Sequence, residues 1–142
     1  MEKVIELRRH GVFRLGEIQA LIPIIHKITK SYSQQVEALV HQIDAVGPEN
    51  EEVVAGLEKR VNELVESWQG KVEKLGGLTR GLWLADFDSG DGYFCWKYPE
   101  EKIEFWHGYS EGFSGRIRIE QKMPKSVVEK AKLECASPEV SL

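Results

Sequence analysis

Apolar residues recur every three or four positions from residue 15 to residue 46. Ten positions make up this seam, and only Thr29 is polar: Leu15, Ile18, Ile22, Ile25, Thr29, Tyr32, Val36, Leu39, Ile43 and Val46. This heptad spacing predicts a long amphipathic helix. Pro23 lies inside the pattern, so either the helix begins there with proline in its first turn, or a short preceding helix bends at that residue.

A second seam starts directly after Gly47 and Pro48, which end the first helix because glycine accepts a left-handed cap and proline cannot continue a helix. Its members are Val54, Leu57, Val61, Leu64, Trp68, Lys71 and Leu75. Such a short connection makes the two helices antiparallel. Helices of this length reach about 40–48 Å at about 1.5 Å per residue. The pattern therefore predicts a helical hairpin over residues 14–76.

Helices this long present more apolar surface than a small sheet can cover. We expect a second copy of the chain to cover the surplus, most simply in a homodimer, and a different protein partner is the other occupant. The predicted interface residues are Tyr32, Val36, Leu39, Ile43, Val61 and Leu64.

After Gly70, Gly76 and Gly77, which we expect to end the second helix, the period of the pattern changes to two. The glycine-rich stretch 88–92 favours a hairpin turn between the strands on either side of it. Further alternation around residues 103–107 and 116–120 completes a three- to four-stranded antiparallel meander over residues 80–121. The predicted fold class is α+β, with the hairpin packed on the meander in a single domain, 1–142. An arm (1–13) precedes it, and a partly helical or disordered tail (122–142) follows.

The composition narrows the function classes. The chain has 142 residues, 42% hydrophobic and 30% charged, which is the balance of a folded globular protein. A net charge of −4 argues against binding to nucleic acid or to an anionic membrane. The sequence shows neither an apolar run of about 18 residues nor a signal peptide pattern. Cys95 and Cys135 are the only cysteines, so we expect a reduced, cytoplasmic protein without a disulfide framework.

Four polar residues near the predicted strand ends are the candidates for chemistry: Asp86, Glu104, His107 and Arg116. In one hypothesis, His107 with Asp86 or Glu104 binds a divalent metal or acts as a general base. Arg116 then grips an anionic group, and Trp96 and Trp106 form the walls of the site. In the structural alternative, Arg116 makes a bidentate ion pair with Asp86 or Glu104, and His107 is a core histidine bonded to a backbone carbonyl.

Strand alternation bears on these hypotheses. His107 shares a face with Ile103 and Phe105, whereas Glu104 shares the other face with Trp106, so a metal site using both Glu104 and His107 needs a bulge. Cys95 is expected to be a small buried hydrophobe rather than a nucleophile. A pairing of Cys95 with His107 on one face of the sheet is geometrically conceivable.

Several ordered motifs resemble one known family. Residues 17–23 (EIQALIP) are similar to its "EANxLLP" opening, with Gln19 in place of asparagine. In the second half, Phe94–Lys97 (FCWK), Ile103–His107 (IEFWH) and Gly112–Arg116 (GFSGR) are similar to its "LCWK", "IEYWH" and "GFxGR". Gly81–Leu82 with Asp86–Phe87 is similar to its "GLVDF", although Asp88 stands where proline is usual. The family is the uncharacterised bacterial one catalogued as domain of unknown function 2203. The resemblance implies a helical hairpin with a small sheet and implies no activity.

Two functions from different classes follow. The first is a non-catalytic cytoplasmic module that self-associates through its helices. The second is a small-ligand or divalent-metal-binding protein, or an enzyme, with its site on the meander. A buried set of mutually paired polar groups favours the first, and a concave site with unpaired polar groups favours the second.

Overall fold

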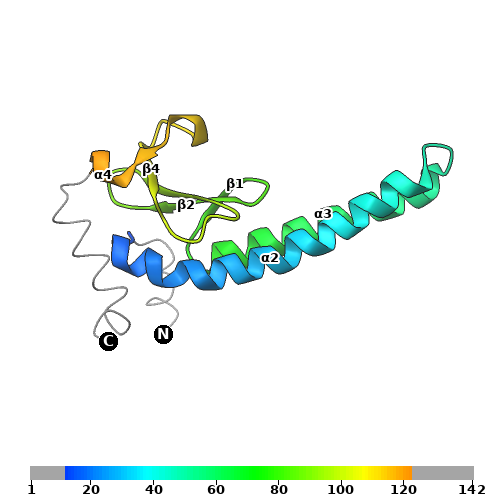
Figure 1. The fold of residues 1–142 in the computed structure, drawn as a ribbon, viewed down its shortest axis with the longest axis horizontal. Coiled ribbons are helices and arrows are strands. Elements are labelled where there is room, and N and C mark those ends of the chain that lie inside the picture. The colour runs from blue at the N-terminus through cyan, green and yellow to red at the C-terminus, as the bar shows by residue number, and fades with distance from the viewer. Residues whose placement is uncertain (1–11, 123–142) are drawn as a thin grey trace.

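The computed structural model describes residues 12–122, and its main feature is an antiparallel pair of long helices (Figure 1). Helix α2 spans Leu15–Val46, and α3 spans Glu51–Lys74. The predicted hairpin is confirmed. Helix α2 begins directly after Arg14, whose backbone N–H donates to the Glu17 carboxylate at 2.8 Å, and it runs through Pro23 without ending. Gly70 lies inside α3 and does not end it, contrary to expectation.

The sheet has five strands in sequential order, each antiparallel to its neighbours. They are β1 (Leu78–Gly81), β2 (Leu84–Asp88), β3 (Tyr93–Lys97), β4 (Phe105–His107) and β5 (Ile117–Arg118), and a short helix α4 (Ile119–Lys122) follows. The α+β class is therefore confirmed, with one strand more than expected. The extra strand is β1, which joins β2 through a tight turn where Trp83 has a φ of 59°.

The core lies between one face of the sheet and the neighbouring halves of the two helices (Figure 1). Trp68 of α3 is fully buried there, and its indole N–H donates to the Thr29 hydroxyl at 2.8 Å. That bond explains the single polar position in the first seam, because a buried indole N–H needs an acceptor. We call residues 12–32 and 68–122 the head.

Gln19 connects α2 to the loop before β4. Its side-chain amide donates to the Ile103 carbonyl at 2.9 Å, and its carbonyl accepts the Ile103 N–H at 2.8 Å. Both groups are buried, so the glutamine supplies the partners that a strand would otherwise give to this backbone.

The rest of the hairpin, residues 33–67, extends past the sheet as a two-helix rod, which we call the stalk (Figure 1). The predicted interface residues are already buried or half-buried within a single chain. Val36 is buried, and Tyr32, Leu39, Ile43, Val61 and Leu64 are half-buried. The Tyr32 hydroxyl, at the base of the stalk, also hydrogen-bonds the Ser67 hydroxyl of α3 at 2.7 Å.

The predicted arm and tail fall almost entirely outside the described residues. Within residues 12–122, no helix is both long enough and apolar enough to span a membrane.

Candidate metal centre

The sheet has an inner face against the helices and an outer face turned away from them. Alternation places Ala85, Phe87, Phe94 and Trp96 in the core beneath the inner face. Asp86 and Cys95 lie opposite each other on β2 and β3, and His107 of β4 pairs with Tyr93, two residues from Cys95 on β3. Since side chains two residues apart share a face, Asp86, Cys95 and His107 come together on the outer face.

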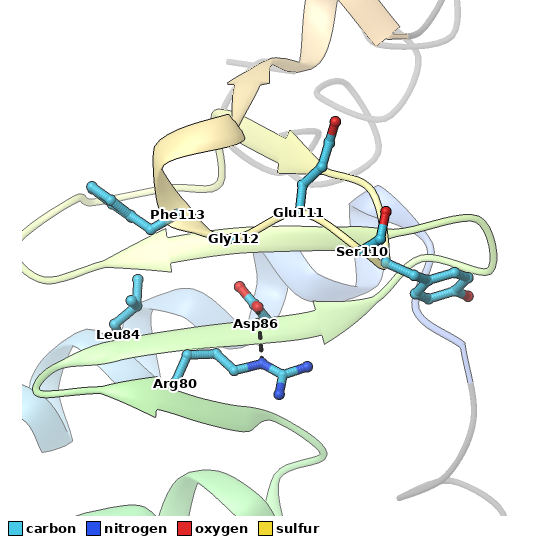
Figure 2. A pocket seen from close by; sticks show the side chains of 8 residues that line it. Arg80, Leu84, Asp86, Ser110, Glu111, Gly112 and Phe113 are labelled. Atoms are coloured by element: carbon cyan, nitrogen blue, oxygen red, sulfur yellow. Dashed lines mark hydrogen bonds and ion pairs between the residues drawn. The ribbon is translucent and has the colours of Figure 1, made fainter.

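A segment that we call the cover, residues 108–116, passes over this outer face and contains a short 3-10 turn, Phe113–Gly115 (Figure 2). Arg116, the last residue of the cover, holds this segment in place through its side chain. The guanidinium lies over the rings of Phe105 and Phe113, at 3.9 and 4.2 Å from their centroids, and pairs with Glu100 through two contacts of 2.7 and 3.3 Å. The bidentate pair predicted for Arg116 therefore exists, but with Glu100 in place of Asp86 or Glu104.

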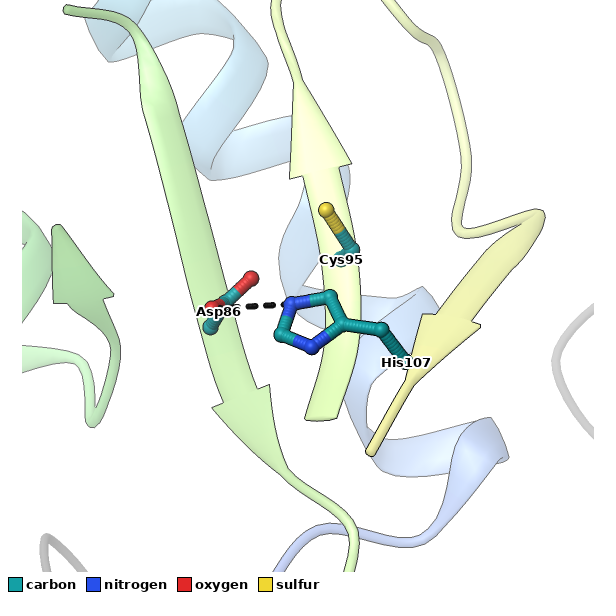
Figure 3. Close-up of side chains that lie close together, drawn as sticks. All are labelled: Asp86, Cys95 and His107. Atoms are coloured by element: carbon teal, nitrogen blue, oxygen red, sulfur yellow. Dashed lines mark hydrogen bonds and ion pairs between the residues drawn. The ribbon is translucent and has the colours of Figure 1, made fainter. Parts of the chain in front are cut away.

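Beneath the cover, Asp86, Cys95 and His107 form a buried cluster. Their side chains are almost fully buried, and one donor atom from each lies within 4.8 Å of the other two. Figure 3 shows the imidazole reaching from β4 toward β2, with Nε2 directed at the Asp86 carboxylate and Cys95 beside the ring on β3. The Nε2–Oδ2 distance is 3.0 Å, and Nδ1 lies 2.9 Å from the Gly108 carbonyl oxygen. His107 thus has the backbone carbonyl partner that the structural alternative expected, and the acidic partner that the metal hypothesis expected.

These two contacts restrict the state of His107. The Gly108 carbonyl oxygen can only accept, so Nδ1 must carry the hydrogen. In a neutral imidazole, Nε2 then directs a lone pair at the carboxylate, and two lone pairs 3.0 Å apart repel. At this distance a hydrogen must therefore lie between Nε2 and Oδ2, and a metal ion bound to both atoms would take its place only with the two atoms slightly farther apart.

The Asp86 carboxylate is satisfied on one side only. Oδ2 accepts from Arg80 Nε at 3.2 Å as well as facing His107. Oδ1 is buried and has no hydrogen-bond partner among the described residues. Figure 3 shows this second oxygen turned to the side of Cys95. An unpaired buried carboxylate oxygen costs free energy, so a further positive or hydrogen-donating group at Oδ1 would stabilise the cluster.

Cys95 carries an inactive thiol as the cluster stands. Burial, and then the negative charge of Asp86, raise its pKa to about 12, and the opposing charge of Arg116 only partly offsets them. A thiol with this pKa is protonated at neutral pH, so the three residues do not amount to an activated Cys–His–Asp nucleophile. A bound metal ion would reverse this situation, because a thiol that coordinates a metal binds as the thiolate and releases its proton to solvent.

The other predicted site residues lie elsewhere. Trp96 and Trp106 point to the inner face, where their indole N–H groups donate to the Glu100 carbonyl and to the Ser89 hydroxyl, so they are not walls of this site. Glu104 is half-buried, with Lys102 at 4.0 Å, and takes no part in the cluster, as the alternation predicted. Arg80, which contacts Asp86, was missed because it belongs to the unpredicted strand β1.

A pocket of about 430 Å³ opens beside the cluster (Figure 2). The sheet side is lined by Arg80, Leu84 and Asp86, and the cover contributes residues 109–113. Of the three cluster residues, Asp86 is the one that also lines this pocket, so it connects the buried site to the outside.

Comparison with known proteins gives one assignment. Neither the curated proteins nor the solved structures contain a match to this chain. The family described as "Uncharacterized conserved protein (DUF2203)" matches residues 11–119, which include both long helices, all five strands and every residue of the cluster. The chain belongs to this family of uncharacterised conserved proteins, as its motifs indicated.

Proposed function

We propose that the head binds a divalent transition metal ion, zinc in the first place, through Asp86, Cys95 and His107. Carboxylate, thiolate and imidazole are the three side-chain ligands of protein zinc sites. Three protein ligands with an open fourth position are typical of zinc sites that also bind water or a substrate. The metal hypothesis made from the sequence thus gains a third ligand, Cys95.

The spacing of the three donor atoms supports this proposal. Donor atoms on one tetrahedral zinc ion lie about 3.3–3.6 Å apart, because the metal–ligand bonds are about 2.0–2.3 Å long. Here the Asp86 and His107 donors are 3.0 Å apart, and every pair in the cluster lies within 4.8 Å. Side-chain rotations that move one donor by little more than 1 Å would complete the geometry.

The observation that carries the proposal is the need for positive charge in the cluster. Nε2 of His107 faces a carboxylate, Oδ1 of Asp86 has no partner among the described residues, and the Nδ1–H bond to Gly108 is the outer-shell contact that orients metal-binding histidines. A proton on Nε2 would relieve the first of these features and the Cys95 thiol hydrogen could serve the second, whereas a metal ion would bind all three donors at once.

The test is elemental analysis of untagged protein that was purified without chelator and then saturated with zinc and dialysed. We expect about one zinc per chain, lost in Cys95→Ser, which keeps the size of the side chain, and in His107→Ala. The control is His41→Ala, since His41 is exposed on the stalk. Circular dichroism confirms that each variant is folded. Wild-type protein that holds no zinc after saturation, or Cys95→Ser that holds as much as wild type, contradicts the proposal.

A second function, self-association in a homodimer, is favoured by the surface of the stalk. The seam residues there are only half-buried, and Val40 and Val53 are 40% and 52% exposed. We propose that a second copy of the chain packs along the stalk and forms a four-helix bundle, which would cover both edges of the seam. We also place the protein in the cytoplasm, where a free thiol such as Cys95 stays reduced.

Charge sets a condition on this dimer. Residues 33–67 hold eight acidic and two basic side chains, a net charge of −6, whereas the rest of the chain sums to +2. Two stalks therefore repel each other at low ionic strength, and added salt screens that repulsion. The dimer is expected to strengthen as salt rises.

The native mass, measured by light scattering after size-exclusion chromatography at two salt concentrations, tests the dimer. We expect the double variant Val40→Glu/Val53→Glu to be monomeric at both. Gln42→Glu adds one charge at an exposed stalk position without removing apolar surface, and it should stay dimeric at high salt. A monomeric wild-type protein at high salt rules out the dimer.

A further inference from the structure

We infer that the pocket beside the cluster binds a small ligand carrying a phosphate or carboxylate group, which reaches the metal ion and is held by Arg80. The inference rests on the proposed metal site and names the class of ligand that this site would take. It starts from the pocket volume of about 430 Å³, which lies within the range of small-molecule sites.

Arg80 is placed to receive an oxyanion. Only its Nε bonds Asp86, so the two terminal nitrogens have no partner among the described residues. The guanidinium lies 5.1 Å from the centre of the Tyr93 ring, which together with the Nε bond limits its orientation, and its side chain is 45% exposed at the pocket. A planar guanidinium with two free N–H groups matches the geometry of carboxylate and phosphate oxygens.

The floor of the pocket completes the argument. Asp86 is only 3% exposed, yet it lines the pocket, and its Oδ1 lacks a partner within residues 12–122. A metal ion on Asp86 would therefore lie at the inner end of the pocket, with its fourth position open in that direction. A ligand oxygen on the metal and a second oxygen on Arg80 would belong to the same anionic group.

Charge explains why the metal is required. Without it, the pocket is lined by one cation, Arg80, and two carboxylates, Asp86 and Glu111. The Glu111 carboxylate accepts the Gly108 N–H at 2.8 Å, which keeps it within the cover. A divalent ion offsets both carboxylates and leaves Arg80 available to attract an anion. Two sources share this chemistry, a phosphate ester and a carboxylic acid.

The experiment is calorimetric titration of zinc-loaded protein, freed of unbound zinc, with inorganic phosphate and separately with acetate. We expect saturable binding of at least one of them, and the tighter of the two identifies the source. Arg80→Gln should weaken that binding by about 10- to 100-fold while it keeps its zinc. Arg118→Gln is the matched control, because Arg118 is an exposed arginine of β5 that does not line this pocket, and it should bind as wild type does.

The possible failures are distinguishable. Zinc-loaded wild-type protein that binds neither anion overturns the inference and leaves the metal site standing. Equal binding by Arg80→Gln and wild type overturns the assignment of Arg80. Protein that cannot be loaded with zinc overturns the proposed function, and the inference with it.

Discussion

The stalk and the head share the same two helices, yet their polar groups lie in opposite environments, exposed in the stalk and buried in the head. In the stalk, the charged side chains are exposed and the apolar seam is mostly half-buried. In the head, Gln19, Thr29, Asp86 and His107 are buried, and each has a specific partner. Water solvates the polar groups of the stalk, so they need no defined geometry, whereas the buried polar groups of the head do.

This difference indicates where chemistry is placed in the molecule. A repeated seam supplies length and a surface for another helix. Buried polar groups cost free energy unless they are paired, so an unsatisfied group such as Asp86 Oδ1 points to a ligand more strongly than any exposed charge does.

The sharpest way to separate the two regions is to truncate one apolar residue in each. Trp68→Ala removes a fully buried indole that also packs against Trp83 with 5.0 Å between ring centroids, and it leaves the Thr29 hydroxyl without its donor. We expect a loss of about 3–5 kcal/mol in the free energy of unfolding. Leu57→Ala, in the half-buried seam of the stalk, should cost about 1–2 kcal/mol. Urea denaturation measures both free energies of unfolding. Equal losses in the two variants would contradict the difference between the head and the stalk.

The fastening of the cover is the next largest effect. Arg116→Ala deletes the bidentate pair with Glu100 and the contacts with two phenylalanine rings, and should cost about 2–3 kcal/mol. Arg118→Ala, at an exposed position two residues away, should change stability by less than about 0.5 kcal/mol. Thermal unfolding distinguishes them. A stable Arg116→Ala variant would restore the reading of Arg116 as a grip for a ligand.

Replacing a glycine by alanine should change the stability of the protein in opposite directions in the two regions. A Cβ at Gly92, in the head, would lie 2.2 Å from the Trp106 ring and 2.5 Å from the His107 carbonyl oxygen, so Gly92→Ala should destabilise by about 1–3 kcal/mol. At Gly56, in the stalk, a Cβ would meet no atom within 4 Å, and Gly56→Ala should stabilise the exposed helix by up to about 1 kcal/mol. Melting temperatures that move in the same direction would contradict this contrast.

The smallest effect concerns a surface ion pair of the head. Lys122, 2.5 Å away, lowers the pKa of Asp91 below its ordinary value of 3.8, and the Asp91 side chain is 57% exposed. Because the folded pKa is the lower one, the stabilisation is present above the unfolded pKa and is lost as the pH falls through the folded pKa. Asp91→Asn should therefore cost less than about 1 kcal/mol at pH 7, and less at pH 2 than at pH 7.

Denaturation at both pH values, with Asp44→Asn on the stalk as the control, checks this prediction. No ion pair of Asp44 is found within the described residues, so its replacement should change little. An Asp91→Asn loss that is the same at pH 2 would show that the pair with Lys122 is not its cause.

The regions also differ in how far the sequence predicts them. The hairpin was predicted almost to the residue because its seam repeats over many turns, and a repeated pattern outweighs local exceptions such as Pro23. Strand β1 was missed, since its four residues, Leu78–Gly81, are mostly exposed and show no alternation. Arg80 lies in this strand and was therefore not predicted as a site residue.

The site was predicted in part for a similar reason. Alternation along β2, β3 and β4 is regular, so it separated His107 from Glu104 correctly and left Cys95 and His107 on one face. It also put Trp96 on the opposite face from Cys95, so the same alternation argued against the tryptophan walls. The partner of Arg116 was not predictable, because Glu100 lies in the irregular segment between β3 and β4 and no periodic pattern places it.

The paired bonds between Gln19 and Ile103 have a consequence for the register of β4. A strand that slips by one residue turns every side chain to the other face, and β4 has only three residues with which to resist such a slip. Because α2 binds both backbone groups of Ile103, two residues before β4 begins, a slip would break both bonds. The helix thereby determines that His107, and not Trp106, faces Asp86.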